Sequence, residues 1–236
     1  MATSSVDALR LLTRGSLAVK GQMPWSSNVT LLVEAALDGV TALAVYKPGR
    51  GERPLWDFPP GLYRREIAAY QLSEALGWGL VPLTIRREGP YGDGSVQLFV
   101  PADFEQHYFT LLEDAGHHDR LKRICVFDLL ANNADRKSGH CLLGQDGVIY
   151  AIDNGLCFHA GAKLRTVIWE FGGDPIPREV LRDLRRLLKR ELPAPLADLL
   201  DPAEREALLR RTRALVEHGR FPAMDQSDHR YPWPPV

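Results

Sequence analysis

Two short stretches in the second half of the chain are the most informative part of the sequence. Residues 133–140 read Asn-Ala-Asp-Arg-Lys-Ser-Gly-His, and residues 151–155 read Ala-Ile-Asp-Asn-Gly. The first stretch follows the apolar part of a predicted helix, residues 121–130, and is polar enough to form a loop. Strand-like residues around an Asp-Gly turn lie between the two stretches and predict a tight β-hairpin. Asp135 and Asp153 are 18 positions apart, a spacing at which one hairpin returns both carboxylates to the same end.

A pair of carboxylates placed in this way suits phosphoryl transfer. One Asp near an acceptor hydroxyl acts as a base or orients the hydroxyl, and a second Asp holds the Mg²⁺ that bridges the phosphates. The hairpin between them, with predicted strands 141–144 and 148–152, is therefore a candidate catalytic hairpin. Asp135 is the candidate base, and Asp153 is the candidate metal ligand.

The first hundred residues are predicted to form a hairpin, a helix and a second hairpin. Residues 28–34 and 41–47 are rich in β-branched and apolar residues, and an Asp-Gly turn signal separates them. Apolar residues at helical spacing predict a helix over 64–76. Two further strands are predicted over 81–87 and 95–100, around a turn-rich segment. From residue 177 onward the patterns are mainly helical, with helices expected over about 178–190 and 203–218.

The composition is that of an ordinary soluble globular protein. The 236 residues include 29 Lys plus Arg and 30 Asp plus Glu, and 45% are hydrophobic. A formal net charge of -1 gives no global attraction to nucleic acid or to an anionic membrane. No apolar run approaches the length of a membrane span, and the N-terminus lacks the features of a targeting segment. Three cysteines without metal or redox spacing fit a reducing compartment, so we expect a cytoplasmic protein.

Residues 135–140 and 152–155 resemble the catalytic core of the phosphatidylinositol 3- and 4-kinase-like superfamily. In that superfamily an Asp-Arg-x-x-x-Asn loop precedes a hairpin and an Ile-Asp-Phe-Gly motif, and here the segments read Asp-Arg-Lys-Ser-Gly-His and Ile-Asp-Asn-Gly. The whole chain is similar to small actinobacterial proteins of unassigned function that are distantly related to those lipid kinases. The clearest N-terminal signs of this likeness lie at residues 45–48, 51–58 and 65–70.

The resemblance implies an α+β, kinase-like bilobal fold. We expect a β-rich N-terminal lobe over residues 1–100 and a mainly helical C-terminal lobe over residues 101–236, which contains the catalytic hairpin. Nucleotide, expected to be ATP, is implied in the cleft between the lobes. The likeness does not supply the acceptor of the phosphoryl group.

The likeness also gives roles to a lysine and a glutamate of the N-terminal lobe. Lys47 ends a strand whose alternation places it on one face with Leu43 and Val45, at the rim of an apolar surface. A kinase-like fold holds at this place the lysine that reaches the nucleotide phosphates. Glu66, early in the next helix, is expected to orient Lys47, or else it is a first-turn carboxylate favoured by the helix dipole.

Two further segments are weaker candidates for nucleotide contacts. Ser26, Ser27 and Asn28 lie in a loop before the first predicted strand, where hydroxyls and backbone donors could cover phosphates. An ordinary loop is the alternative, because neither a GxGxxG nor a Walker A sequence is present. Gln97 and Phe99 occupy the position of the hinge between lobes, where backbone groups and an aromatic ring could hold the base.

The chain departs from the kinase pattern at two positions. His140 stands where those kinases place a metal-binding Asn, and Asn154 replaces the Phe of the Asp-Phe-Gly motif. Imidazole is a softer ligand than an amide oxygen, which suits Mn²⁺ or Zn²⁺ better than Mg²⁺. We therefore expect Asp153 and His140 to hold Mg²⁺ or Mn²⁺. Beside the candidate base, Arg136 either holds the loop through a carboxylate or touches substrate.

The leading hypothesis is an ATP- and metal-dependent phosphotransferase, with a protein or small-molecule hydroxyl favoured over a lipid as the acceptor. An AMP transferase that uses the same cleft is one alternative. A nucleotide-binding pseudokinase that acts through a protein partner is the other, and the departures at His140 and Asn154 would fit it. The basic face of residues 178–190 could meet an acidic lipid headgroup, although such a stripe is more often the wet side of an amphipathic helix.

Overall fold

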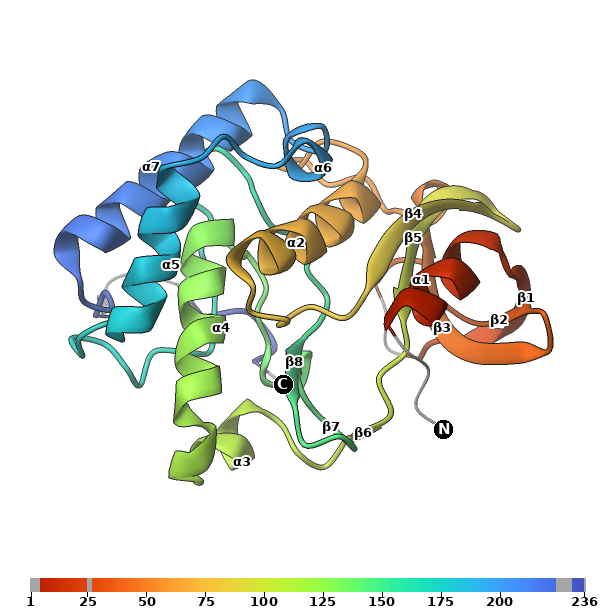
Figure 1. The fold of residues 1–236 in the computed structure, drawn as a ribbon, viewed down its shortest axis with the longest axis horizontal. Coiled ribbons are helices and arrows are strands. Elements are labelled where there is room, and N and C mark those ends of the chain that lie inside the picture. The colour runs from red at the N-terminus through yellow and green to blue at the C-terminus, as the bar shows by residue number, and fades with distance from the viewer. Residues whose placement is uncertain (1–4, 25–26, 224–230, 236) are drawn as a thin grey trace.

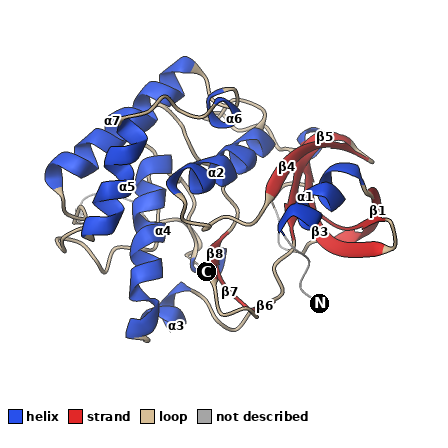
Figure 2. Ribbon diagram, in the orientation of Figure 1, coloured by secondary structure: helices blue, strands red, loops and turns tan. Residues whose placement is uncertain are grey.

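The computed structural model describes residues 5–24, 27–223 and 231–235. An antiparallel sheet occupies one side of the view in Figure 1, and long helices occupy the other side. A second sheet of short strands lies near the middle, and Figure 2 shows one helix against the larger sheet while the longer helices gather on the opposite side. The chain therefore has the mixed α/β architecture that the sequence predicts.

The larger sheet has five strands in the order β1-β2-β3-β5-β4, and all neighbouring pairs are antiparallel. The strands are β1 (Ser16–Gln22), β2 (Leu31–Leu37), β3 (Val40–Pro48), β4 (Thr84–Gly89) and β5 (Gly92–Leu98). Asp38 and Gly39, with φ of 50° and 79°, form the turn between β2 and β3. Both predicted hairpins are confirmed, with boundaries shifted by up to three residues.

One face of this sheet is covered by α1 (Ser5–Arg14). The small core between helix and sheet consists of apolar side chains from both, namely Leu11, Leu12, Leu31, Val33, Ala35, Ala44, Tyr46 and Val96. Neither α1 nor β1 was predicted from the sequence patterns. Most β1 side chains are exposed at the sheet edge, so this strand lacks the alternation that marks a half-buried strand.

The second sheet has the order β6-β7-β8 and contains the candidate catalytic hairpin. Its strands are β6 (Ala102–Asp103), β7 (Cys141–Gly144) and β8 (Ile149–Ala151). Cys141 pairs with Ala151 at one end of the hairpin. The chain therefore enters β7 and leaves β8 at the same end, as the spacing of the two carboxylates predicts.

The helices share a larger hydrophobic core. They are α2 (Leu62–Leu76), α3 (Tyr108–Leu112), α4 (His118–Ala131), α5 (Arg178–Leu188), α6 (Ala194–Ala197) and α7 (Pro202–His218), with 3-10 turns at Gly49–Gly51, Ala115–His117 and Ser138–His140. Leu72 of α2 is buried in one cluster with Phe127 of α4 and Leu184 of α5. Because α2 also contacts β4 and β5, it connects the sheet to the helical core. In the described part of the chain, no helix is long and apolar enough to cross a bilayer.

Candidate active site

Lys47, near the end of β3, lies at the centre of a group of charged side chains from different elements. Its ammonium contacts the Glu66 carboxylate on α2 and lies 2.8 Å from Asp153 Oδ1. Alternation along the strand explains this direction, because Tyr46 points into the core under α1 and Lys47 points to the opposite face. The structure thus joins two partners, Lys47 and Asp153, that are 106 positions apart in the sequence.

Glu66 is the buried member of this group. Its side chain is 4% exposed, and its other carboxylate oxygen accepts the Asn154 N–H at 2.9 Å. Burial raises the pKa of Glu66, and the Lys47 ammonium opposes this rise. Burial also lowers the pKa of Lys47, but the carboxylates of Asp153 and Glu66 outweigh it and raise this pKa above its ordinary value. Lys47 is therefore a firmly charged cation with one fixed carboxylate partner.

Asp153 is the exposed member of the group, with half of its side chain accessible to solvent. It follows β8 in a left-handed backbone conformation with φ of 56°, which a residue other than glycine rarely adopts. The next residue holds this turn, because Asn154 donates its N–H to Glu66 and accepts a 2.7 Å hydrogen bond from Arg136 through Oδ1. The Lys47 ammonium lowers the pKa of Asp153. An ionised carboxylate is thus presented beside Lys47 and toward solvent.

His140 approaches Asp153 from the loop that precedes β7. Its Nε2 lies 3.4 Å from Asp153 Oδ2, and its Nδ1 lies 3.0 Å from the Asp135 carbonyl oxygen. Burial lowers the pKa of His140 to about 4, so the ring is neutral near pH 7. The Lys137 N–H also donates to His140 Nδ1 at 3.3 Å, so a backbone carbonyl and a backbone N–H both contact this nitrogen, while Nε2 faces the Asp153 carboxylate.

Asp135 is the candidate base, and its environment raises its basicity. Its N–H donates to Asn133 Oδ1 at 2.9 Å, which fixes the loop, and its carboxylate lies 3.5 Å from the Lys137 ammonium. Burial raises the pKa of Asp135 to about 6 against the opposing effect of Lys137, and the Asp153 carboxylate adds to the rise. A carboxyl group with this pKa can take a proton at neutral pH more readily than an ordinary aspartate.

Arg136 holds the loop from inside the molecule. It is fully buried, and its guanidinium donates to both carboxylate oxygens of Asp128 on α4 at 3.0 to 3.1 Å. The same guanidinium donates to the Ile152 carbonyl at 2.5 Å and to Asn154 Oδ1 at 2.7 Å. Of the two roles that the sequence leaves open for Arg136, the structure shows the first, a bond to a carboxylate. The Arg136–Asp128 pair therefore joins α4, the loop of Asp135 and the turn of Asp153.

Asp128 is not among the predicted site residues, although the sequence contains a signal for it. The residue lies inside an otherwise apolar helical run, Ile124 to Leu130, and it is fully buried. A carboxylate in such a run needs a buried partner, since burial of an unpaired charge is costly. Asn133 and Thr166 complete its set of hydrogen bonds.

The predicted nucleotide contacts are only partly placed. Ser26 lies outside the described residues. Ser27 and Asn28 lie in the connection between β1 and β2, which reaches the Lys47 end of the sheet because Leu31 pairs with Tyr46. The Asn28 side-chain oxygen accepts the Arg53 N–H at 2.8 Å, so this oxygen already has a partner within the protein.

The two hinge candidates lie near the end of β5. Gln97 pairs with Val45 across the sheet, and its side-chain amide donates to Thr84 Oγ1 at 2.8 Å. Phe99, half-buried after the strand, donates its N–H to the Leu43 carbonyl at 3.0 Å. Both residues therefore lie close to strand β3, which carries Lys47. The Gln97 side-chain amide and the Phe99 N–H both donate to groups of the protein itself.

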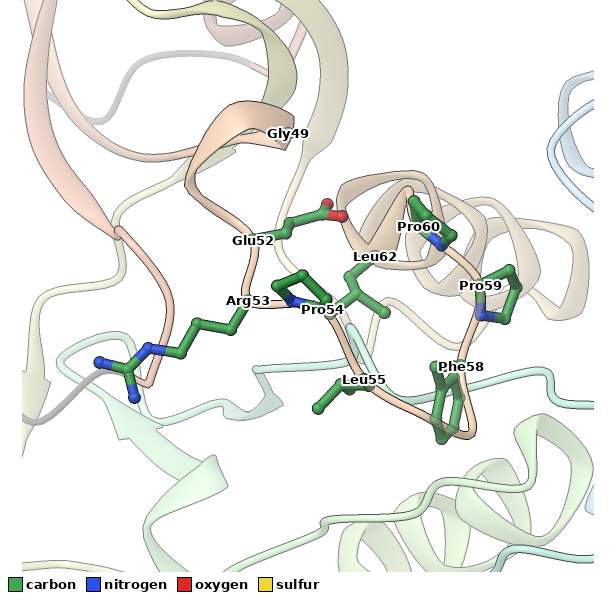
Figure 3. A pocket seen from close by; sticks show the side chains of 9 residues that line it. All are labelled: Gly49, Glu52, Arg53, Pro54, Leu55, Phe58, Pro59, Pro60 and Leu62. Carbon is green, nitrogen blue, oxygen red and sulfur yellow. The ribbon is translucent and has the colours of Figure 1, made fainter.

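A small pocket lies between α2 and the loop that joins it to β3 (Figure 3). Glu52 fixes one wall of this pocket, because its carboxylate accepts the N–H groups of Gly61 and Tyr63 at 2.8 and 2.7 Å. Most of the lining is apolar, and the sticks in Figure 3 show Pro54, Leu55 and Leu62 close together, with Phe58 further along the loop. None of the predicted site residues lines this pocket.

The arrangement as a whole places Lys47, Glu66, Asp135, His140 and Asp153 around one region between the sheet and the catalytic hairpin. Among the described residues, no group of three or more His, Cys, Asp and Glu side chains has the arrangement of a complete metal site. The two predicted metal ligands, His140 and Asp153, are a partial set, with Nε2 and Oδ2 3.4 Å apart. Such a partial site is usual where substrate phosphates and water supply the remaining ligands of the ion.

The fold of this chain is similar to folds seen in solved structures. The structure is similar to hydra Fam20 determined with sugar, with a TM-score of 0.58 over 92% of this chain and 90% of that one, at 14% identity. The proinflammatory kinase CtkA of Helicobacter pylori gives a TM-score of 0.47 over 89% and 94% of the chains, also at 14% identity. At this level of identity the first likeness shows a shared fold.

Sequence comparison identifies a relative of similar length. The chain is 42% identical to protein Rv2133c of Mycobacterium tuberculosis over 266 aligned positions, which cover 97% of this chain and 95% of Rv2133c. The chain belongs to the family of Rv2133c. No protein-family model matches it. The link to an actinobacterial protein is thereby confirmed, and the relation to the phosphatidylinositol 3- and 4-kinase-like superfamily stays a prediction.

Proposed function

We propose that this protein is an ATP- and divalent-metal-dependent phosphotransferase, a kinase of the phosphatidylinositol kinase-like type. The observation that carries the proposal is the position of Lys47, which is shared between buried Glu66 and exposed Asp153 and lies on the face of the sheet away from the core. A kinase needs a lysine fixed by a glutamate in this way, together with a metal-binding aspartate, to hold nucleotide phosphates. The kinase-like fold supports the same conclusion.

Each residue has a role in the proposed transfer. Lys47, fixed by Glu66, binds phosphate oxygens of ATP. The acceptor hydroxyl oxygen attacks the γ-phosphorus, the bond from that phosphorus to the leaving ADP oxygen breaks, and the hydroxyl proton passes to the Asp135 carboxylate. The raised pKa of Asp135, about 6, suits this proton transfer near neutral pH. Arg136 fixes the position of the Asp135 loop relative to the Asp153 turn, because it donates to residues on both sides of Asp153.

The donor atoms fit a divalent cation. Asp153 offers an ionised carboxylate, and His140 would offer Nε2 in the tautomer whose proton on Nδ1 is donated to the Asp135 carbonyl. A mixed nitrogen and oxygen donor set favours Mn²⁺ over Mg²⁺. When bound, the cation would neutralise charge on the ATP phosphates.

Further parts of the proposal concern the surroundings of this site. Residues 1–100 and 101–236 act as two lobes, and backbone groups near Ser27, Asn28, Gln97 and Phe99 contact the nucleotide. A protein or small-molecule hydroxyl is the acceptor rather than a lipid. All three cysteines are free and buried, which supports a reducing compartment such as the cytoplasm.

Substitution of Asp135 tests the proposed reaction. Asp135→Ala removes the proton acceptor and leaves Lys47 and Asp153 in place, so transfer should fall at least 100-fold, as expected for loss of a general base. Release of ADP and labelled phosphate from γ-labelled ATP measures transfer, and calorimetry measures nucleotide binding. Asp119→Ala, an exposed carboxylate of α4, is the matched control. Equal turnover by the Asp135 variant and the parent would show that Asp135 has no such role.

A further inference from the structure

Trp56 is a large apolar side chain presented to solvent from a fixed loop. It is 93% exposed, the highest value among the large hydrophobic residues that the structure describes. The loop around it is held firmly, because Phe58 is buried against Leu62 and Ala134 and because Asp57 accepts a 2.8 Å hydrogen bond from Lys163. The indole is therefore accessible to a partner at a fixed position, and Trp is enriched among the residues that dominate protein interfaces.

Positive charge surrounds this indole. The Lys163 ammonium lies 5.1 Å from the centre of the Trp56 ring system. Arg165 is exposed and close enough to Asp57 to influence its ionisation. Asp57 is already paired with Lys163, whereas Arg165 has no ion pair to the described residues. The surface formed by Trp56, Lys163 and Arg165, here called the Trp56 surface, therefore has uncompensated positive charge.

This surface borders the loop of the candidate base. The Arg165 N–H donates to the Asn133 carbonyl at 2.8 Å, and the Arg165 carbonyl accepts the Arg136 N–H at 3.0 Å. Arg165 is therefore bonded to the backbone on both sides of Asp135, at Asn133 and at Arg136. Phe58, two residues after Trp56, is packed against Ala134. A molecule bound on the Trp56 surface would therefore lie beside Asp135.

The shape of the surface favours a protein over a small metabolite. Small molecules bind in concave sites that enclose most of their area. The concave part of this loop is the pocket of Figure 3, and Trp56 is not among the residues that line it. A projecting indole flanked by Lys and Arg instead has the composition of protein interface hot spots, where Trp and Arg are enriched. A guanidinium binds carboxylates through two parallel hydrogen bonds.

We propose that the Trp56 surface docks a protein acceptor, with acidic side chains of the acceptor on Arg165 and its Ser, Thr or Tyr hydroxyl at Asp135. This inference rests on the proposed phosphotransferase function and names its substrate class. The acceptor hydroxyl oxygen forms the new bond to the γ-phosphorus of ATP, ADP leaves, and Asp135 takes the hydroxyl proton. Trp56 and Arg165 touch the acceptor outside the reacting atoms, so they determine specificity.

A degenerate peptide library with a fixed central Ser, Thr or Tyr tests this inference. The full chain, γ-labelled ATP and Mn²⁺ should label peptides that have Asp or Glu near the hydroxyl. For a selected acidic peptide, Arg165→Glu should lower kcat/KM by about tenfold or more, because like charges then face each other. Trp56→Ala should raise KM by about tenfold, a usual effect of truncating an interface hot spot. Arg165→Gln, a milder change, should give a smaller loss.

Two exposed residues away from this surface supply matched controls. Arg213→Glu on α7 reverses an exposed charge, and Tyr91→Ala removes a half-exposed aromatic ring from the turn between β4 and β5. Both controls should match the parent. Selection of peptides without acidic preference, or the same preference in Arg165→Glu, would overturn the inference and leave the phosphotransferase function standing. Binding of ATP and Mn²⁺ without labelling of any peptide would also overturn the inference and leave the phosphotransferase function standing. Failure to bind ATP with either metal would overturn the function itself, and the inference with it.

Discussion

At the scale of single residues, the ammonium of Lys47 is shared unequally between two carboxylates. Glu66 is buried and also accepts the Asn154 N–H, whereas half of the Asp153 side chain is exposed. A ligand can therefore reach Asp153 and Lys47 without disturbing Glu66. The same asymmetry predicts that Lys47 contributes to stability, because its loss would leave Glu66 buried without a counter-charge.

The substitution Lys47→Ala tests this contribution. It should lower the free energy of unfolding by about 3 kcal/mol, the lower end of the loss measured when one partner of a buried ion pair is removed. The control Lys20→Ala breaks an exposed 2.8 Å pair with Glu34 and should cost less than about 1 kcal/mol. Urea unfolding measures both variants. Similar midpoints for Lys47→Ala and Lys20→Ala would contradict the unequal sharing described here.

At the scale of elements, the Arg136–Asp128 pair joins α4 to the loop of Asp135 and the turn of Asp153. Both side chains are fully buried. Arg136→Lys keeps the charge but loses the planar fork that serves Asp128, Ile152 and Asn154 together. Asp128→Asn keeps the shape but leaves the guanidinium without a counter-charge.

Both changes should destabilise the fold strongly. We expect Asp128→Asn to lower the free energy of unfolding by about 3 to 5 kcal/mol, as for other broken buried ion pairs. Arg136→Lys should cost a comparable amount, since a lysine cannot reach all the acceptors. Chemical denaturation followed by circular dichroism measures the loss. If Asp128→Asn unfolds at the same urea concentration as the parent, the network is not what holds these elements together.

The start of α7 gives a second element-scale prediction. Asp201 accepts the Glu204 N–H at 2.8 Å and caps the helix, while the Glu204 carboxylate also contacts buried Arg65 on α2. Asp201→Ala should cost about 1 kcal/mol, the usual value for an N-cap. Glu204→Ala should cost more, because it removes the cap partner and leaves a buried guanidinium unpaired. Thermal unfolding of the two variants checks this order, and a larger loss for Asp201→Ala would contradict it.

Local patterns in the sequence predict most elements but miss those without a clear local signal. The Asp-Gly turns and the apolar spacing predict both sheet hairpins, the catalytic hairpin, α2, α5 and α7. Strand β1 was missed because its exposed side chains do not alternate. The contact between Arg136 and Asp128 depends on how the loop after α4 folds back against that helix. No local sequence pattern specifies the path of that loop.

At the scale of the whole molecule, ion pairs connect parts of the chain that are far apart in sequence. Lys47 and Asp153 connect the sheet to the catalytic hairpin, and Asp57 and Lys163 connect the loop after β3 to the helical part, each pair at 2.8 Å. The sequence marks Asp135 and Asp153 as candidates by their spacing across one hairpin, and Lys47 and Glu66 through a family resemblance. Their meeting in space depends on the complete fold, because α2 must span the sheet and the helical core.

The most direct measurement is a calorimetric titration of the full chain with ATP, with Mn²⁺ or Mg²⁺ present or removed by EDTA. We expect one nucleotide per chain, bound only with metal, tighter with Mn²⁺ and lost in Asp153→Ala but not in Asp119→Ala. At 100 times the dissociation constant, the bound nucleotide should add about 2.7 kcal/mol to the free energy of unfolding. Absence of ATP binding with either metal, or binding that Asp153→Ala and EDTA leave unchanged, would contradict the proposed site.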